Sequence, residues 1–173
     1  YWQKKPLLIR NAVPGFKPLL SRAQLMVMAS QDGVESRMVV HGAKGWRLSH
    51  GPFARRAFPP LAQSKWTFLV QGVDLHDQNV HDLMQQFRFV PDARLDDLMI
   101  SYATDGGGVG PHYDQYDVFL IQGNGCRRWR VGQLCDDESS LVPHDELRLL
   151  AEFRATDEWL LEPGDILYVP PRI

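Results

Sequence analysis

The chain has 173 residues, of which 44% are hydrophobic, so it can bury one sizeable core and a single domain is expected. Its formal net charge of −2 argues against a general nucleic-acid-binding surface or a polybasic membrane surface. No apolar run is long enough to span a bilayer, and residues 1–6 lack an initiator Met and the arrangement of a signal peptide. Cys126 and Cys135 show no metal-type spacing, which favours free thiols in a reducing cytoplasm.

Short strands separated by turn residues dominate the first part of the chain. They are predicted at residues 6–12, 36–41, 46–49, 66–73 and 97–104. Ser21 and Gln24 have the spacing of a capping box, which predicts a helix from Arg22 to about Ser30. A second, amphipathic helix is predicted where apolar residues recur at i, i+3, i+4 and i+7, namely Val80, Leu83, Met84 and Phe87.

The last part of the chain is expected to continue the β structure. The continuous apolar run at residues 118–121 suits a buried strand, and Asn124 and Gly125 predict a hairpin turn into a strand at residues 125–132. A helix is predicted at residues 143–153. Closing strands are predicted from residue 159, with a tight turn at residues 162–165 and a short buried strand that stops at Pro170 and Pro171.

His112 and Asp114 are the strongest candidates for chemistry. In an extended strand, side chains two residues apart lie on one face, so an imidazole nitrogen and a carboxylate oxygen would converge. Two His and one carboxylate form the facial triad of non-haem Fe(II) oxygenases, and this pair supplies two of the three. The glycines at 106–108 precede the pair and permit close approach of backbone to a ligand. The competing interpretation is a hydrogen-bonded His–Asp pair on a solvated strand.

Arg127 is the second candidate. On the predicted strand it shares a face with Trp129 and Val131, so its guanidinium lies among apolar neighbours and needs an anionic partner. Arg128 and Arg130 would point to the opposite, solvated face.

These blocks, in this order, resemble the Jumonji-C branch of the cupin superfamily. The chain is most similar to the bacterial ribosomal oxygenases, which hydroxylate an arginine in a large-subunit ribosomal protein. The shared stretches are residues 5–10, 51–53, 66–71, 111–122 and 163–171. The resemblance implies a mainly β protein with peripheral helices, a double-stranded β-helix of the cupin or jelly-roll type that is truncated at its C-terminal end. It also implies Fe(II) as the metal, with 2-oxoglutarate and O2 as cosubstrates.

The same resemblance implies roles for individual residues. His112 and Asp114 would be the catalytic metal ligands. Arg127 would bind the distal carboxylate of 2-oxoglutarate, and the hydroxyl of either Ser101 or Thr104 could assist it, a choice that the sequence leaves open. Asp105 could hold a substrate guanidinium by paired hydrogen bonds, or it could only stabilise the turn beside the glycines. Tyr116 is expected on the metal-facing side, in the substrate pocket.

The third ligand marks a departure from the family pattern. In the family it is a histidine a few residues beyond the double proline, whereas here no His follows His144. The chain is therefore expected to be a fragment that stops before the third ligand and has little or no turnover by itself. A dimerisation or substrate-clamping domain is expected outside this chain, so a homodimer through such regions stays open.

The resulting prediction is an Fe(II)- and 2-oxoglutarate-dependent protein arginine hydroxylase whose partner is a ribosomal protein. One alternative is a Jumonji-C oxygenase with another target, either a histidyl or asparaginyl hydroxylase or a lysyl demethylase. The other alternative is a cupin that binds a ligand without catalysis. The joint presence of His112, Asp114 and Arg127 disfavours this last interpretation.

Overall fold

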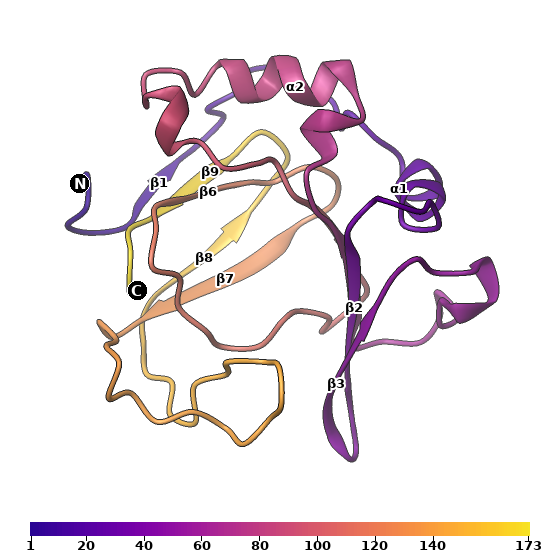
Figure 1. Cartoon of the computed structure of the whole chain (residues 1–173). Helices are drawn as coiled ribbons and strands as arrows, with labels where there is room; N and C mark the ends of the chain where they lie inside the picture. The colour runs from indigo at the N-terminus through magenta and orange to yellow at the C-terminus, as the bar shows by residue number, and fades with distance from the viewer. The chain divides into compact units, whose positions relative to one another are not determined.

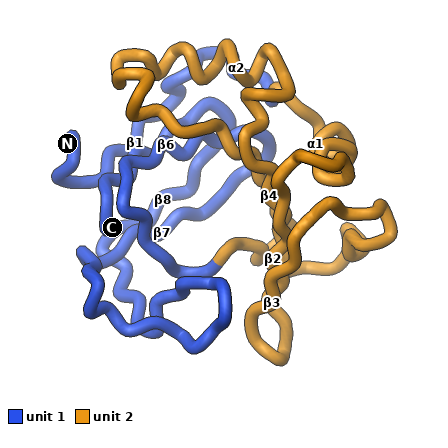
Figure 2. Tube along the Cα trace, in the orientation of Figure 1, with its two compact units in different colours: residues 1–18, 110–173 blue, residues 19–109 orange.

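The computed structural model describes residues 1–173, which divide into two compact units (Figures 1 and 2). The central unit comprises residues 19–109, and the terminal unit comprises residues 1–18 together with residues 110–173. Each unit contains its own sheet structure and its own cluster of buried apolar side chains.

The central unit is built on a four-stranded antiparallel sheet in the order β3-β2-β4-β5. Its strands are β2 (Ser36–Gly42), β3 (Gly45–His50), β4 (Trp66–Val70) and β5 (Ile100–Ala103). Its helices are α1 (Arg22–Met28) and α2 (Gln78–Gln85), with 3-10 turns η1 (Arg55–Ala57), η2 (Val73–Leu75) and η3 (Asp92–Arg94). Every residue of β4 is buried, as expected for a strand paired on both edges and covered on both faces.

Both α-helices begin where local side chains satisfy their first N–H groups. At α1, the Ser21 hydroxyl accepts from the Gln24 N–H while the Gln24 side chain accepts from the Ser21 N–H, so the predicted capping box is confirmed. At α2, the Asp77 carboxylate accepts from the two backbone N–H groups of Asn79 and Val80. The inward faces of the two helices bury Leu25 and Val80.

The core of the central unit is aromatic. Trp66 and Phe68 are fully buried on one face of β4, and the Phe68 ring lies 5.1 Å from Phe58 and 5.9 Å from Tyr102 between ring centres. Because such rings bury large apolar areas, this cluster is a main source of stability for the unit. The indole N–H of Trp66 is buried without a hydrogen-bond partner.

The terminal unit contains two separate sheets. One has three antiparallel strands in the order β1-β9-β6, formed by Leu7–Ile9, Ile166–Val169 and Val118–Ile121. The other is the antiparallel pair of β7 (Arg127–Gly132) and β8 (Ala155–Leu161). Val131, Leu161 and Leu167 form the buried cluster of this unit.

The N-terminal segment is fastened to the β9 region by polar contacts. The Asp165 carboxylate accepts hydrogen bonds from the Arg10 guanidinium (2.6 Å) and the Asn11 N–H (2.9 Å). Burial by itself would raise the pKa of Asp165, but hydrogen bonds from the Glu162 and Asn11 N–H groups and from Arg10 outweigh it and lower the pKa below its ordinary value. The first and last strands of the chain are thereby held side by side.

A second fastening involves Tyr168 on β9. Its hydroxyl donates to the Asp117 carboxylate and accepts from the Gln3 N–H at 2.8 Å, while the Trp2 ring stacks on the Tyr168 ring with centres 5.4 Å apart. Burial of the phenol and the hydrogen bond to Asp117 together raise the pKa of Tyr168 to about 12.

Most of the predicted elements are present, but a predicted hairpin and a predicted helix are absent. Residues 118–132 do not form a hairpin, because β6 pairs with β9 and β7 pairs with β8. Residues 143–153 form no helix, since their backbone groups bond to other segments: Leu150 N–H donates to Pro111 and Ala151 N–H to Ser140. The mainly β character with two α-helices is confirmed, and both cysteines are free. The helices are too short and too polar for any of them to cross a membrane.

Candidate metal centre

His112 lies in an irregular loop that leads into β6, so the predicted extended strand at this position is wrong. Gly110 begins the loop with φ of 82°, a conformation that glycine adopts without strain. The Gly110 carbonyl oxygen lies 2.9 Å from His112 Nδ1. Because a carbonyl only accepts, Nδ1 is the donor in this contact, and in a neutral imidazole this leaves the lone pair on Nε2. A second ring nitrogen held in this way is typical of metal-binding histidines.

Asp114 completes the pair, and the two side chains converge as predicted although no strand places them. His112 Nε2 lies 3.9 Å from Asp114 Oδ2, and the side chains are 37% and 35% exposed, respectively. Two neighbouring donors that each lie about 2.1 Å from one ion are about 3.0 to 3.4 Å apart, because the angle between them at the ion is about 90° to 109°. The observed separation is wider, so the two side chains would have to approach each other slightly to hold one metal ion.

Backbone hydrogen bonds from distant segments fix the loop on both sides of His112. The Pro111 carbonyl accepts from the Leu150 N–H at 2.8 Å, and the Asp114 carbonyl accepts from the Arg172 N–H at 2.7 Å. The Tyr113 hydroxyl donates to the Asp136 carbonyl at 2.8 Å. The position of the ligand pair thus depends on the fold of the whole terminal unit.

Arg127 is half-buried at the start of β7, opposite the fully buried Leu161 of β8. Its guanidinium carbon lies 5.8 Å from the centre of the Trp129 ring, and Arg128 and Arg130 are exposed, so the predicted division of this strand into two faces is confirmed. Burial lowers the pKa of Arg127 from its ordinary value because desolvation disfavours the charged form. A half-buried guanidinium with its fork of N–H donors is suited to bind a carboxylate.

The two proposed substrate residues are placed differently. Tyr116 follows the ligand pair in the same loop and is 60% exposed. Asp105 belongs to the central unit, where it is exposed and its carbonyl accepts from the Lys65 N–H at 2.9 Å. The structure therefore brings together His112 and Asp114, while the roles of Asp105 and Tyr116 remain predictions.

Two residues that position the centre were not singled out from the sequence. Gly110 orients His112 through its carbonyl, and a glycine directly before the motif was the available signal. Arg172 has φ of 69°, donates its N–H to Asp114, and bonds through its Nε to the Cys135 carbonyl at 2.9 Å. Nothing in the local sequence predicts a left-handed arginine at this position.

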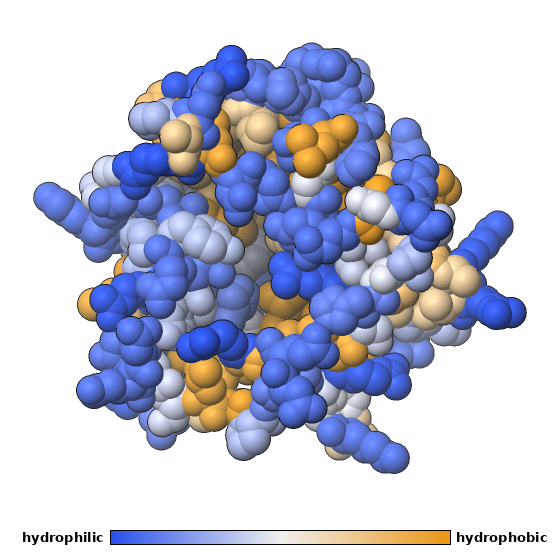
Figure 3. All heavy atoms as spheres, in the orientation of Figure 1, coloured by the Kyte–Doolittle hydropathy of each residue, from blue (hydrophilic) through white to orange (hydrophobic).

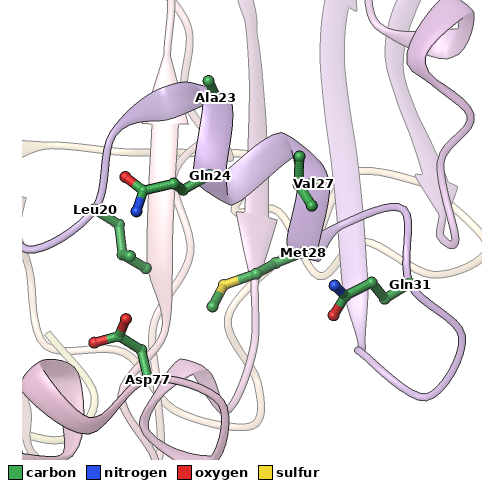
Figure 4. Close-up of a pocket in the computed structure, with 7 residues that line it drawn as sticks. All are labelled: Leu20, Ala23, Gln24, Val27, Met28, Gln31 and Asp77. Atoms are coloured by element: carbon green, nitrogen blue, oxygen red, sulfur yellow. The ribbon is translucent and has the colours of Figure 1, made fainter.

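Nowhere in residues 1–173 do three or more His, Cys, Asp or Glu side chains gather in a way that could hold a metal ion, so His112 and Asp114 have no third candidate ligand beside them. The central unit has a separate, mostly apolar hollow beside α1 (Figure 4). It is lined by Leu20, Ala23, Gln24, Val27, Met28, Gln31 and Asp77. Its one carboxylate, Asp77, already caps α2, so the hollow has no free group for chemistry.

Comparison with known proteins identifies relatives of this chain. Residues 82–173 match the JmjC domain family. The chain is 44% identical to the ribosomal protein uL16 3-hydroxylase of Escherichia coli over 171 residues, which cover 99% of this chain and 45% of that protein. It is 39% identical to a probable ribosomal oxygenase of Haemophilus influenzae over 176 residues, which cover all of this chain and 43% of the relative.

A solved structure supports the same relationship. YcfD, a ribosomal oxygenase from Escherichia coli in complex with cobalt and 2-oxoglutarate, superposes with a TM-score of 0.86 at 42% identity. The match covers 99% of this chain and 44% of YcfD. The predicted cupin fold of the Jumonji-C type is thereby confirmed, and this chain spans less than half the length of the relatives that it matches.

Proposed function

Since the chain belongs to the JmjC-domain family, we propose that it forms the metal- and cosubstrate-binding part of an oxygenase that hydroxylates a ribosomal protein, with Fe(II), 2-oxoglutarate and O2 as reactants. The observation that carries this proposal is the orientation of His112, whose Nε2 faces the Asp114 carboxylate at 3.9 Å while Gly110 holds Nδ1. The names of the relatives, which include a uL16 3-hydroxylase and ribosomal oxygenases, support the substrate class.

His112 and Asp114 would hold the iron through Nε2 and a carboxylate oxygen. A third ligand is proposed to be a histidine that follows Ile173 in a longer protein. The Arg172 N–H donates to the Asp114 carbonyl, which places the residues around Arg172 beside the ligand loop and supports this proposal. With two ligands, residues 1–173 alone are expected to bind iron weakly and to give little turnover.

Arg127 would bind the distal carboxylate of 2-oxoglutarate through paired N–H donors. Its partial burial strengthens such a charge-assisted contact because little water competes for the guanidinium. When bound, the iron and the cosubstrate supply the oxidising chemistry that inserts one oxygen atom into an unactivated C–H bond. The protein groups would orient the cosubstrate and the substrate side chain and limit the access of water.

The substrate residue is proposed to be an arginine. Asp105, an exposed carboxylate beside the glycine turn, would pair with its guanidinium, and Tyr116, which follows the ligand pair in the sequence, is proposed as a second substrate-binding residue.

The test is mass spectrometry of an arginine-containing uL16 peptide incubated with Fe(II), 2-oxoglutarate and O2. The enzyme is the longer protein that carries this chain, compared with its His112→Ala variant and with His76→Ala, an exposed histidine of the central unit, as the matched control. We expect a mass gain of one oxygen atom on arginine with the parent and with His76→Ala, and none with His112→Ala. Succinate without peptide modification would remove this substrate, and absence of both products with iron bound would refute the oxygenase.

A further inference from the structure

The charges of the chain are unevenly distributed. Residues 36–73 contain none of the 21 acidic residues but six of the 19 Lys and Arg residues. These six are Arg37, Lys44, Arg47, Arg55, Arg56 and Lys65. The net charge of −2 therefore conceals a strongly basic segment that lies entirely within the central unit.

The structure exposes the cations of this segment. Residues 36–73 include β2, β3, η1 and β4, and five of the six cations are exposed, Arg37 being half-buried. None of the six makes an ion pair with a carboxylate. In Figure 1 the β2–β3 hairpin and the loop between β3 and β4 extend from the rest of the central unit, and Figure 3 shows hydrophilic side chains along these edges. Exposed cations that have no carboxylate partner are available to an external anion.

The strand register places three of these cations close together at the end of the hairpin. His41 pairs with Trp46 across β2 and β3, and the His41 N–H donates to the Lys65 carbonyl at 2.9 Å on the other side. Lys65, His41 and Trp46 therefore form one row across three neighbouring chain segments, spaced by about 5 Å. Arg47 is adjacent to Trp46 on β3, and Lys44 lies in the turn that closes the hairpin.

An aromatic surface lies among these cations. The His41 and Trp46 rings stack with centres 4.2 Å apart and planes 7° apart, and His41 is exposed while Trp46 is half-buried. The next residue in the row is Asp105, whose carbonyl accepts from the Lys65 N–H and whose carboxylate makes no ion pair with Lys65. Asp105 lies at one end of the row, and the opposite end, at Trp46 next to Arg47, contains no acidic residue.

We propose that this basic hairpin, defined by His41, Lys44, Trp46, Arg47 and Lys65, binds the phosphate backbone of a single-stranded nucleic acid, with single-stranded RNA as the probe. Cations that follow a backbone together with a flat ring on which a base can stack are the combination that proteins use for single-stranded nucleic acid. An acidic peptide would satisfy the cations but would leave the stacked rings without a matching partner. The proposal is independent of the proposed oxygenase function, because none of these residues belongs to the metal centre.

The test is fluorescence anisotropy of a labelled single-stranded RNA of about 16 nucleotides titrated with the full chain at KCl from about 50 to 200 mM. The charge variant combines Lys44→Ser, Arg47→Thr and Lys65→Asn. Asn is chosen because Lys65 has φ of 64°, a conformation that Asn tolerates. The matched control, which removes the same charge from the terminal unit, combines Lys17→Ser, Arg148→Ser and Arg154→Ser, all exposed.

We expect saturable binding. The slope of the logarithm of the binding constant against the logarithm of the KCl concentration should be less steep by about 2 in the charge variant, because it loses three cations and each phosphate contact on a single strand contributes about 0.7. The control should keep the parent slope. Trp46→Ala should weaken binding about tenfold with its slope unchanged, because stacking releases no counterions. Circular dichroism confirms that each variant is folded.

Three outcomes would overturn the proposal. One is absence of saturable binding at the lowest salt, and another is equal loss of affinity in the charge variant and its control. The third is displacement of the RNA by a poly-glutamate peptide added at the same concentration of negative charges, which would show that the surface binds anions in general. Because the readout is RNA binding and not hydroxylation, failure of this proposal leaves the proposed oxygenase function untouched.

Discussion

Replacement of Tyr168 by phenylalanine should change the pH dependence of stability in a defined direction. The Tyr168 side chain is 3% exposed, and its hydroxyl donates to the Asp117 carboxylate and accepts from the Gln3 N–H. The variant keeps the ring and its stacking on Trp2 but removes both hydrogen bonds. Because the acceptor is charged but partly solvated, we expect a loss of about 1 to 2 kcal/mol at neutral pH.

The alkaline range gives the sharper test. Burial and the Asp117 hydrogen bond raise the pKa of Tyr168 to about 12, whereas tyrosine in an unfolded chain titrates near 10. A raised pKa stabilises the folded state below the unfolded value, and this stabilisation is lost as pH rises through the folded value. Two pKa units correspond to about 2.7 kcal/mol, of which about 2 kcal/mol should be lost between about pH 9 and pH 11.5.

The assay is urea unfolding followed by tryptophan fluorescence at several pH values. The measured quantity is the difference in unfolding free energy between the parent and Tyr168→Phe, in which the titration of all other groups cancels. Tyr1→Phe, at a tyrosine that is 57% exposed, is the control for the loss of one phenol group from the chain. A parent-minus-Tyr168→Phe difference that stayed constant from pH 9 to pH 11.5 would refute the argument from burial and Asp117.

Three further predictions concern packing and cosubstrate binding. Leu167→Ala, at a side chain with 0% exposure in the terminal unit, should lower the free energy of unfolding by about 2 to 5 kcal/mol in urea titrations. Gly132→Ala should cost about 1 to 3 kcal/mol, since the new Cβ would lie 2.6 Å from a ring carbon of Phe153, whereas Gly108→Ala has no atom within 4 Å and should be nearly neutral. Arg127→Lys in the longer protein should raise the KM for 2-oxoglutarate at least tenfold, measured by succinate formation, because lysine lacks the paired donors; an unchanged KM would contradict the assigned role.

Elements with strong local signals were predictable from the sequence. The α1 helix was found through the spacing of Ser21 and Gln24, and both of the hydrogen bonds that this spacing implies are formed. The amphipathic pattern around Val80 located α2, which buries that residue completely. In both cases the determining contacts lie within a few residues along the chain, so a local pattern contains the information.

The errors occur where pairing is long-range. The turn residues Asn124 and Gly125 suggested that the flanking strands pair with each other, but Ile121 pairs with Ile166 and Arg127 pairs with Leu161. A turn signal shows where the chain reverses and cannot show which edge each strand joins. Similarly, the apolar residues at positions 143–153 have helical spacing. Leu150 is nevertheless buried in an extended segment that forms an isolated β-bridge with Leu141.

The candidate centre combines both situations, because its two residues could be proposed from the sequence while the conformation of their loop could not. The identity of His112 and Asp114 follows from donor chemistry, which the sequence displays directly. Their convergence, however, is set by hydrogen bonds from Leu150 and Arg172 to the ligand loop, and Arg172 lies at the far end of the chain. A loop held in this way has no strand-to-strand hydrogen bonds of its own, so it should lose its conformation when the distant partners are lost. The metal affinity of this site should therefore follow the stability of the whole terminal unit, so a remote packing change such as Leu167→Ala should weaken metal binding as well as folding.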